Sequence, residues 1–117
     1  MYLKFNDEYV RDIVEHEKRT TWRVDARKDM LPGDPINLIS DELGNFGSAE
    51  IVWVKHTSIE YLTDEDEKWH ESYDNTEERL EALEEFYPNK SLLPTTAVTV
   101  IRFELLNHRV PEDYNDS

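Results

Sequence analysis

Cysteine is absent from the chain, and only 3 glycines and 5 prolines stand among its 117 residues. The lack of cysteine excludes disulfide bonds, thiolate zinc sites and a cysteine nucleophile. So few glycines and prolines argue against a largely disordered chain. No apolar run is long enough to cross a bilayer and no signal-peptide pattern begins the sequence, so we expect a cytoplasmic protein that does not enter a membrane.

Basic residues are also scarce. The chain has 13 lysines and arginines against 27 aspartates and glutamates, which gives a net charge of −14, and the acids are spread along its whole length. This distribution is typical of a protein from a high-salt cytoplasm, although a large net charge is also an ordinary solubility device. In molar salt the Debye length falls to about 3 Å, so the negative charge does not exclude RNA as a ligand.

The length fits one domain with a single modest core, and the order of predicted elements indicates a β-rich fold. Predicted strands lie at 2–5, 20–24, 36–40, within 46–62 and at 95–106, and predicted helices lie at 7–16, at 63–72 and from Asn75 or Thr76 up to Pro88. We expect the long strand to bend or bulge near Lys55–Thr57. Since few strands are separated by helices, we predict an α+β fold, a mainly antiparallel β-barrel with about three flanking helices. We expect residues 1–106 to form this domain and residues 107–117 to form a polar, flexible tail.

The stretch HEKRTTWR, residues 16–23, gathers cations and hydroxyl groups at one point of this acidic chain. Its second half is rich in β-branched and aromatic residues, which predicts a strand. Side chains alternate between the two faces of a strand. Trp22 and Val24 should therefore face the core. Thr21 and Arg23 should face a cleft or solvent.

The residue types around this predicted strand suit hydrolysis of an amide. A threonine such as Thr21 needs a neighbouring base to act as a nucleophile. Lys18 can be that base if burial and the charge of Arg23 lower its pKa. Glu71 can accept or donate a proton if its own pKa is suitably raised. The same groups can bind a nucleobase, and Lys18 and Arg23 can equally be surface cations that pair with nearby acids, so the spacing alone leaves three alternatives open.

HEKRTTWR also resembles the signature of the ASCH family, which belongs to the PUA-like β-barrels. In that signature a glycine, a lysine, a threonine and an arginine follow one another at fixed spacing, and Lys18, Thr21 and Arg23 stand in the last three places. The surrounding sequence agrees, since a predicted helix precedes the stretch and Gly33–Asp34 leads into the next predicted strand. The resemblance covers about residues 2–106 and implies a PUA-like barrel.

Among small ASCH proteins, one group of similar size hydrolyses the acetamide of N4-acetylcytidine with a lysine, a threonine and a glutamate. The resemblance therefore implies Lys18, Thr21 and Glu71 as catalytic residues, with Glu67 as the alternative carboxylate. Other members are linked to RNA binding, and some to RNA cleavage. RNA or a modified nucleoside is thus the expected partner, and a non-catalytic RNA-binding module, a regulatory interaction module or a ribonuclease are the alternative functions.

Three further residues are candidates for ligand binding. Arg23 belongs to the signature. His16 occupies the place of the signature's glycine, so we expect it either to take the left-handed conformation that ends a helix or to extend into the cleft. Trp69 lies in an otherwise polar predicted helix, from which it could cover the cleft and stack on a base.

A metal site and an organic cofactor are not expected. His56, His70 and Glu71 are the available ligands, and their spacing matches no standard zinc motif. We favour a monomer, although the sequence carries no direct signal of the oligomeric state.

Overall fold

The structure is a computed structural model that describes residues 1–27 and 29–111. Five strands form one sheet in the order β1-β3-β4-β5-β2. The strands are β1 (Tyr2–Lys4), β2 (Thr20–Arg23), β3 (Pro35–Ser40), β4 (Gly44–Ser58) and β5 (Ala97–His108). The helices are α1 (Val10–Glu15) and α2 (Thr76–Phe86), with short 3-10 helices at Asp7–Tyr9, Ile59–Tyr61 and Asp64–Glu67.

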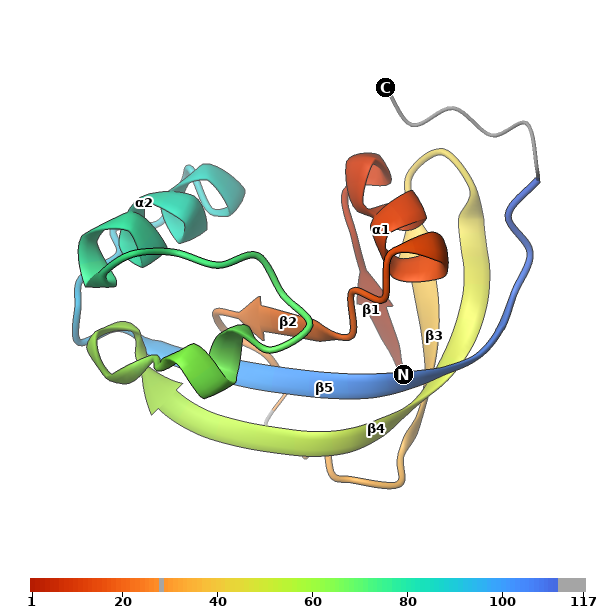
Figure 1. Ribbon diagram of the computed structural model, residues 1–117, viewed down its shortest axis with the longest axis horizontal. Helices are drawn as coiled ribbons and strands as arrows, with labels where there is room; N and C mark the ends of the chain where they lie inside the picture. The colour runs from red at the N-terminus through yellow and green to blue at the C-terminus, as the bar shows by residue number, and fades with distance from the viewer. Residues whose placement is uncertain (28, 112–117) are drawn as a thin grey trace.

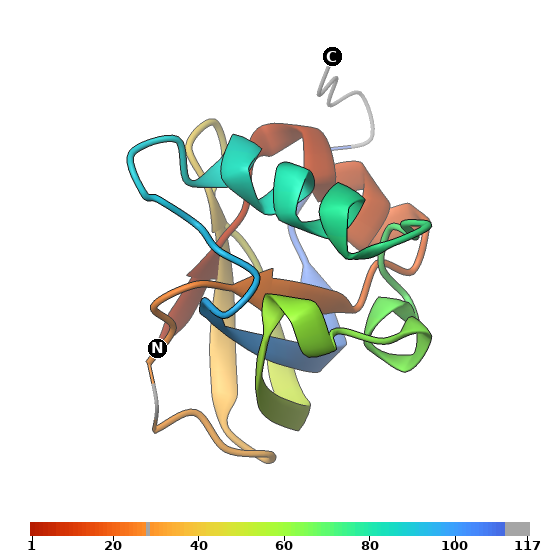
Figure 2. The ribbon, with the colours of Figure 1, turned by 90° about the vertical axis from the view of Figure 1, so that its left-hand side faces the viewer.

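The sheet is mixed and strongly curled into a half-barrel, and both helices lie on the same side of it (Figures 1 and 2). β1 pairs with β3 in parallel, while the other three pairs are antiparallel. A parallel pair needs a long crossover, which here includes α1 and β2. The α+β prediction is confirmed, and the sheet is mainly antiparallel as predicted, although its one parallel pair makes it mixed. The barrel with about three flanking helices is corrected to a half-barrel with two α-helices among the described residues.

The prediction of a helix at 63–72 is wrong beyond its first turn. Its capping box forms between Thr63 and Asp66, yet the helical turn ends at Glu67 and is of the 3-10 type. Side chains of β2 bind the carbonyls that a longer helix would use, since Trp22 Nε1 donates to the carbonyl of Asp66 at 2.9 Å and Thr20 Oγ1 donates to that of Lys68 at 2.6 Å. The residues from the end of this turn to the start of α2 form an irregular stretch, which we call the 68–75 segment.

Bulges between β4 and β5 curl the sheet, with Leu106 of β5 and Val52 of β4 as the extra residues, and both lie beside parts of β4 that precede the bend or bulge predicted near Lys55–Thr57. The register of β4 with β5 shifts between Ser48 and Ala49 and again between Ile51 and Trp53. Each bulge inserts an extra residue, which bends the strand and increases its twist. Gly47 lies beside the first shift, where a Cβ atom would meet the carbonyl oxygen of Asn107 at 2.7 Å. The curl therefore depends on a glycine that lets two strands approach closely.

Two hydrophobic clusters form the core, and β5 contributes to both. One cluster lies beneath α1 and includes Leu3, Phe5, Val10, Ile13, Leu38, Phe46, Ile51, Ile101 and Phe103. The other reaches α2 and includes Trp22, Val24, Ile59, Leu62, Leu83, Leu92, Val98 and Val100. Trp22 and Val24 are thus buried, as the alternation along β2 predicts.

β5 continues to His108, two residues past the predicted end of the domain at 106. The amide of Arg109 still donates to the carbonyl of Phe46, so the chain remains bound to the sheet at that point. Residues 112–117 of the predicted tail lie outside the described residues. Within residues 1–27 and 29–111, no helix has the length and apolar character that a membrane crossing requires.

Candidate functional site

A cavity of about 350 Å³ opens between β2, the 68–75 segment and α2. This volume lies at the small end of the roughly 300–1,000 Å³ found for ligand pockets. Its polar lining includes Lys18, Thr21, Arg23 and Glu71. Its aromatic lining includes Phe5, Tyr9, Trp22, His70, Tyr73, Phe86 and Tyr87. The cavity therefore combines flat apolar walls with a few convergent polar groups.

Lys18 and Glu71 form an ion pair inside this cavity, although 53 positions separate them in the chain. The Lys18 Nζ atom donates to Glu71 Oε2 at 2.9 Å and to the backbone carbonyl of Thr20 at 3.2 Å. The Lys18 side chain is buried, with 7% of its surface exposed, whereas that of Glu71 is 39% exposed. The ammonium group also lies 5.2 Å from the centre of the Tyr9 ring.

Burial and pairing act in opposite directions on these two groups. Burial lowers the pKa of Lys18, and the charge of Glu71 offsets only part of this effect. Burial alone would raise the pKa of Glu71, but the charges of Lys18 and His70 and the hydrogen bond from Lys18 outweigh it, so the net pKa is lowered. The cavity thus holds an amine whose proton is easier to remove than usual, next to a carboxylate that stays ionised.

Thr21 and Arg23 reach the cavity from β2, next to each other on one face of the strand. Arg23 Nε donates to Thr21 Oγ1 at 3.0 Å, and the guanidinium carbon lies 4.7 Å from the centre of the Phe5 ring. Burial lowers the pKa of Arg23. Because the Thr21 oxygen accepts from Arg23, its own proton remains available for donation to another group.

Hydrogen bonds between β2 and the 68–75 segment bring Glu71 to Lys18. The amides of Arg19 and Thr20 both donate to the carbonyl of Trp69, at 3.0 and 3.2 Å. Thr20 Oγ1 donates to the carbonyl of Lys68 at 2.6 Å. The backbone at Trp69 takes a left-handed conformation, with φ of 56°, which turns the chain sharply just before Glu71. This local strain is compensated by the three bonds from the start of β2.

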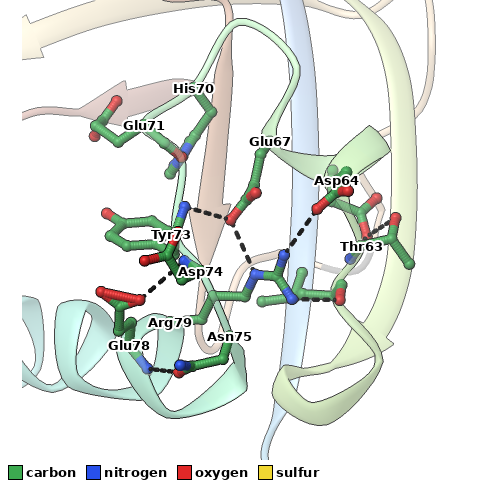
Figure 3. Close-up of polar contacts among 12 residues, drawn as sticks. Thr63, Asp64, Glu67, His70, Glu71, Tyr73, Asp74, Asn75, Glu78 and Arg79 are labelled. Atoms are coloured by element: carbon green, nitrogen blue, oxygen red, sulfur yellow. Dashed lines mark hydrogen bonds and ion pairs between the residues drawn. The ribbon is translucent and has the colours of Figure 1, made fainter.

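The second carboxylate suggested by the sequence, Glu67, has a different partner (Figure 3). It is buried, and its Oε2 atom accepts from Arg79 Nε at 2.9 Å and from the amide of Tyr73 at 3.0 Å. Arg79, from α2, also donates to the carbonyl of Leu62 at 2.9 Å and lies 3.4 Å from Asp64. Glu67 therefore ties the 68–75 segment to α2, and Glu71 is the carboxylate beside Lys18.

His70 lines the cavity and was not among the predicted site residues. Its ring stacks on Trp22 with centroids 4.2 Å apart and planes inclined by 13°. Burial lowers the pKa of His70 to about 4, and the charge of Lys18 acts in the same direction. The sequence shows a histidine beside Glu71, but nothing in the spacing predicts that its ring turns back onto β2.

Two tyrosines that line the cavity, Tyr9 and Tyr73, were also not among the predicted site residues. Tyr9 lies within the range predicted as the first helix, and in the structure its ring packs against Phe86 of α2, with centroids 5.7 Å apart. Burial and the charge of Glu71 raise the pKa of Tyr9, and they raise the pKa of Tyr73 to about 12. Both phenols therefore remain neutral hydrogen-bonding groups at neutral pH.

Two of the predicted ligand-binding residues, His16 and Trp69, are not among the side chains that line the cavity. His16 is exposed at the end of α1 with φ of −114°, and the left-handed position is the next residue, Glu17, with φ of 56°. The Trp69 side chain is 44% exposed. Its ring lies 5.1 Å from the guanidinium of Arg102 and 4.6 Å from the ammonium of Lys68.

The part of the chain that the structure describes contains no group of three histidine, aspartate or glutamate side chains arranged as metal ligands. His56 lies on β4, where its Nδ1 atom is 3.2 Å from Thr99 Oγ1. His70 Nδ1 faces the backbone carbonyl of Glu71.

No protein-family model and no curated protein match the sequence. The fold does match solved structures. A protein of Enterococcus faecalis V583 described under family DUF984 has a TM-score of 0.67 at 12% identity, over 97% of this chain and 84% of its own. The ASCH domain from Lactobacillus crispatus JV V101 has a TM-score of 0.59 at 13% identity, over 80% of this chain and 67% of its own.

The ASCH protein from Zymomonas mobilis is a third structural match, with a TM-score of 0.61 at 11% identity, over 92% of this chain and 67% of its own. These matches show that the fold is that of ASCH-domain, PUA-like proteins, as the resemblance of HEKRTTWR implies. One fold supports many reactions, so at such low identity the likeness does not extend to substrate or activity.

Proposed function

We propose that the cavity binds RNA or a modified nucleoside and hydrolyses the acetamide of N4-acetylcytidine. The observation that carries this proposal is that Lys18, Thr21, Arg23 and Glu71 line one cavity, with Lys18 Nζ 2.9 Å from Glu71. The ASCH-type fold supports it, because these residues stand at the signature positions of that family and at the glutamate implied by the resemblance. Aromatic walls suit a planar base.

The first half of the proposed reaction transfers the acetyl group to the protein. Thr21 Oγ1 forms a bond to the acetyl carbon while its proton passes to the deprotonated form of Lys18. Burial favours this form, since it lowers the pKa of the amine. The bond between the acetyl carbon and N4 then breaks, Lys18 returns the proton to N4, and cytidine leaves. Arg23 is fixed beside Thr21 and stabilises the negative charge that develops on the acetyl oxygen.

The second half removes the acetyl group with one molecule of water. The water attacks the acetyl carbon of the Thr21 ester while Glu71 accepts its proton. The ester bond breaks, the proton passes to the Thr21 oxygen, and acetic acid leaves. The sum of both halves is one amide and one water converted to cytidine and acetic acid.

The test is incubation of the protein with N4-acetylcytidine in concentrated salt, with release of cytidine followed by chromatography. We expect turnover that rises as pH approaches the pKa of Lys18 from below. Lys18→Met and Thr21→Ala should remove it. Lys90→Met is the matched control, because Lys90 is exposed and pairs with Asp25 outside the cavity. Release of cytidine by Lys18→Met at the wild-type rate would exclude the proposal.

A second candidate is an RNA-binding module without catalysis, favoured by the exposed Trp69 and its two cations. Arg102 lies between Trp69 and Trp53, 5.1 and 4.7 Å from the two ring centres. Aromatic rings beside cations bind single-stranded bases by stacking, a mode that tolerates salt. This function predicts RNA binding in concentrated salt that Trp69→Ala weakens, with no cytidine released. Shortening of the RNA in the same mixture would instead indicate a ribonuclease, and the absence of any effect of RNA or nucleosides would indicate a regulatory interaction module.

We propose further that the excess of acids is an adaptation to a high-salt cytoplasm and that the protein acts as a monomer. The acids are spread along the sequence, and several of the few cations are engaged in ion pairs within the fold. Sedimentation in concentrated salt checks the oligomeric state.

A further inference from the structure

The imidazole of His70 is held from two directions inside the cavity. One face stacks on Trp22, with 4.2 Å between centroids and 13° between planes. The Nδ1 atom lies 2.9 Å from the backbone carbonyl oxygen of Glu71. The stacking fixes the plane of the ring, and the hydrogen bond fixes its rotation within that plane. The ring is therefore a rigid part of the wall that also carries Glu71.

The hydrogen bond to Glu71 also determines which ring nitrogen carries the proton. A carbonyl oxygen only accepts hydrogen bonds, so Nδ1 must be the protonated nitrogen of His70. Burial lowers the pKa of His70 to about 4, and hence the ring is neutral at neutral pH. In a neutral imidazole the other nitrogen, Nε2, has a free lone pair and acts as an acceptor.

The Nε2 atom of His70 differs in chemical kind from the other polar groups of the cavity. Lys18 and Arg23 are donors, and they suit carbonyl oxygens of a ligand. The carboxylate of Glu71 receives the Lys18 ammonium through both of its oxygens, at 3.3 and 2.9 Å. His70 adds a neutral acceptor that requires no charge on the ligand. A ligand that satisfies the cavity should thus present carbonyl oxygens to the cations and an N–H group to His70.

Building on the proposed function, we propose that His70 Nε2 accepts a hydrogen bond from the exocyclic nitrogen of the base and thereby selects cytosine over uracil. Cytosine carries N–H at that position, both as the free amine and as the acetylated amide. Uracil carries a carbonyl oxygen there, whose lone pairs would face the lone pair of Nε2. A site that hydrogen-bonds an N–H group rejects an analogue that lacks it, because its own polar group is left unpaired.

The experiment measures binding of cytidine and uridine by NMR titration, which detects weak complexes and needs no turnover. For the wild type we expect cytidine to bind at least about tenfold more tightly than uridine. His70→Phe keeps a ring that can stack on Trp22 but removes the acceptor, so the two nucleosides should bind equally. His70→Gln places an acceptor oxygen near the position of Nε2 and should retain part of the preference. His56→Gln is the control, because His56 lies on β4 outside the cavity lining.

The outcomes separate this inference from the proposed reaction. Equal affinity for cytidine and uridine in the wild type, or an unchanged preference in His70→Phe, would overturn the role of His70. Binding of neither nucleoside would overturn it as well. Release of cytidine from N4-acetylcytidine tests the reaction separately, so hydrolysis without base preference, and base preference without hydrolysis, remain distinct results.

Discussion

The Lys18 ammonium lies 2.9 Å from the Glu71 carboxylate, but only the lysine is buried: its side chain is 7% exposed and that of Glu71 is 39% exposed. Removing the glutamate leaves a buried charge without its counterion. Removing the lysine leaves a carboxylate that water can reach. The two partners therefore make unequal contributions to stability when each is removed alone.

From this inequality we predict that Glu71→Gln destabilises the fold more than Lys18→Met does. Loss of the partner of a buried charged donor costs about 1–3 kcal/mol. Methionine fills most of the volume of lysine, so Lys18→Met should cost less than about 1.5 kcal/mol. Unfolding in urea, followed by tryptophan fluorescence in the same salt, measures both. The reverse order would mean that the pair is more open to solvent than its geometry indicates.

The pKa of His70 can be measured directly, and we predict a value of about 4. Lys18→Met should raise it, because the ammonium charge opposes protonation of the ring. The neutral ring is favoured in the folded protein, so its contribution to stability is present above about pH 6.5 and is lost as pH falls through about 4. NMR of the imidazole protons follows the titration. A midpoint of about 6.5, the ordinary value for histidine, would contradict the stacked, buried ring.

Arg79 should be essential for both stability and the geometry of the site. Arg79→Met leaves Glu67 buried without its counterion, and breaking one partner of a buried ion pair costs about 3–5 kcal/mol. Turnover should fall at the same time, because the 68–75 segment loses its attachment to α2. The double variant Arg79→Met/Glu67→Leu should recover stability. Arg27→Met is the control, since Arg27 and its partner Asp29 are exposed, and such pairs contribute about 1 kcal/mol or less.

We predict that Glu17→Gly stabilises the fold and that His16→Gly does not. Glu17 has φ of 56°, a conformation that costs a residue with a Cβ atom about 1–2 kcal/mol. Glycine adopts this conformation without the steric cost, although it loses more conformational freedom on folding. Glu17→Gly should therefore raise the free energy of unfolding by up to about 1 kcal/mol. His16 has φ of −114°, and His16→Gly should therefore lower stability. Thermal unfolding of both variants measures the two effects. A higher melting temperature for His16→Gly instead of Glu17→Gly would place the end of α1 one residue earlier.

Salt should stabilise the protein over a wide range. The acidic side chains behind the net charge of −14 repel one another at low ionic strength. Added salt screens this repulsion because it shortens the Debye length. We expect the melting temperature to rise steadily from about 0.1 M to about 2 M KCl. Sucrose added at low ionic strength serves as the comparison without screening. A melting temperature that is insensitive to KCl would argue against adaptation to concentrated salt.

The parts of the site that depend on one strand follow from the sequence. Alternation along β2 places Trp22 and Val24 in the core and puts Thr21 and Arg23 together on the opposite face. No long-range information is needed for this step, since the period of a strand is two residues. The succession of strands along the chain was also predictable from β-branched and aromatic runs, whereas their order in the sheet and the positions of the bulges were not, because these depend on how the strands pair.

The parts that depend on the 68–75 segment do not follow from the sequence. A capping box and a run of acids predict a helix from Thr63, but side chains of β2 bind the carbonyls that would continue it. Without this tertiary contact, Glu67 and Glu71 cannot be told apart as partners of Lys18. The stacking of His70 on Trp22 escapes prediction for the same reason.

β2 lies at one edge of the sheet, and its outer side is met at both ends by groups from distant segments. The carbonyl of Trp69 binds the amide of Thr20, and the hydroxyl of Tyr87 accepts from the amide of Val24 at 3.1 Å. Free strand edges recruit strands from other molecules and so promote aggregation. The segment that completes the cavity thus also covers the β2 edge, which limits pairing of this edge with another molecule. A variant that loosens it should lose ligand binding and solubility together, from a single cause.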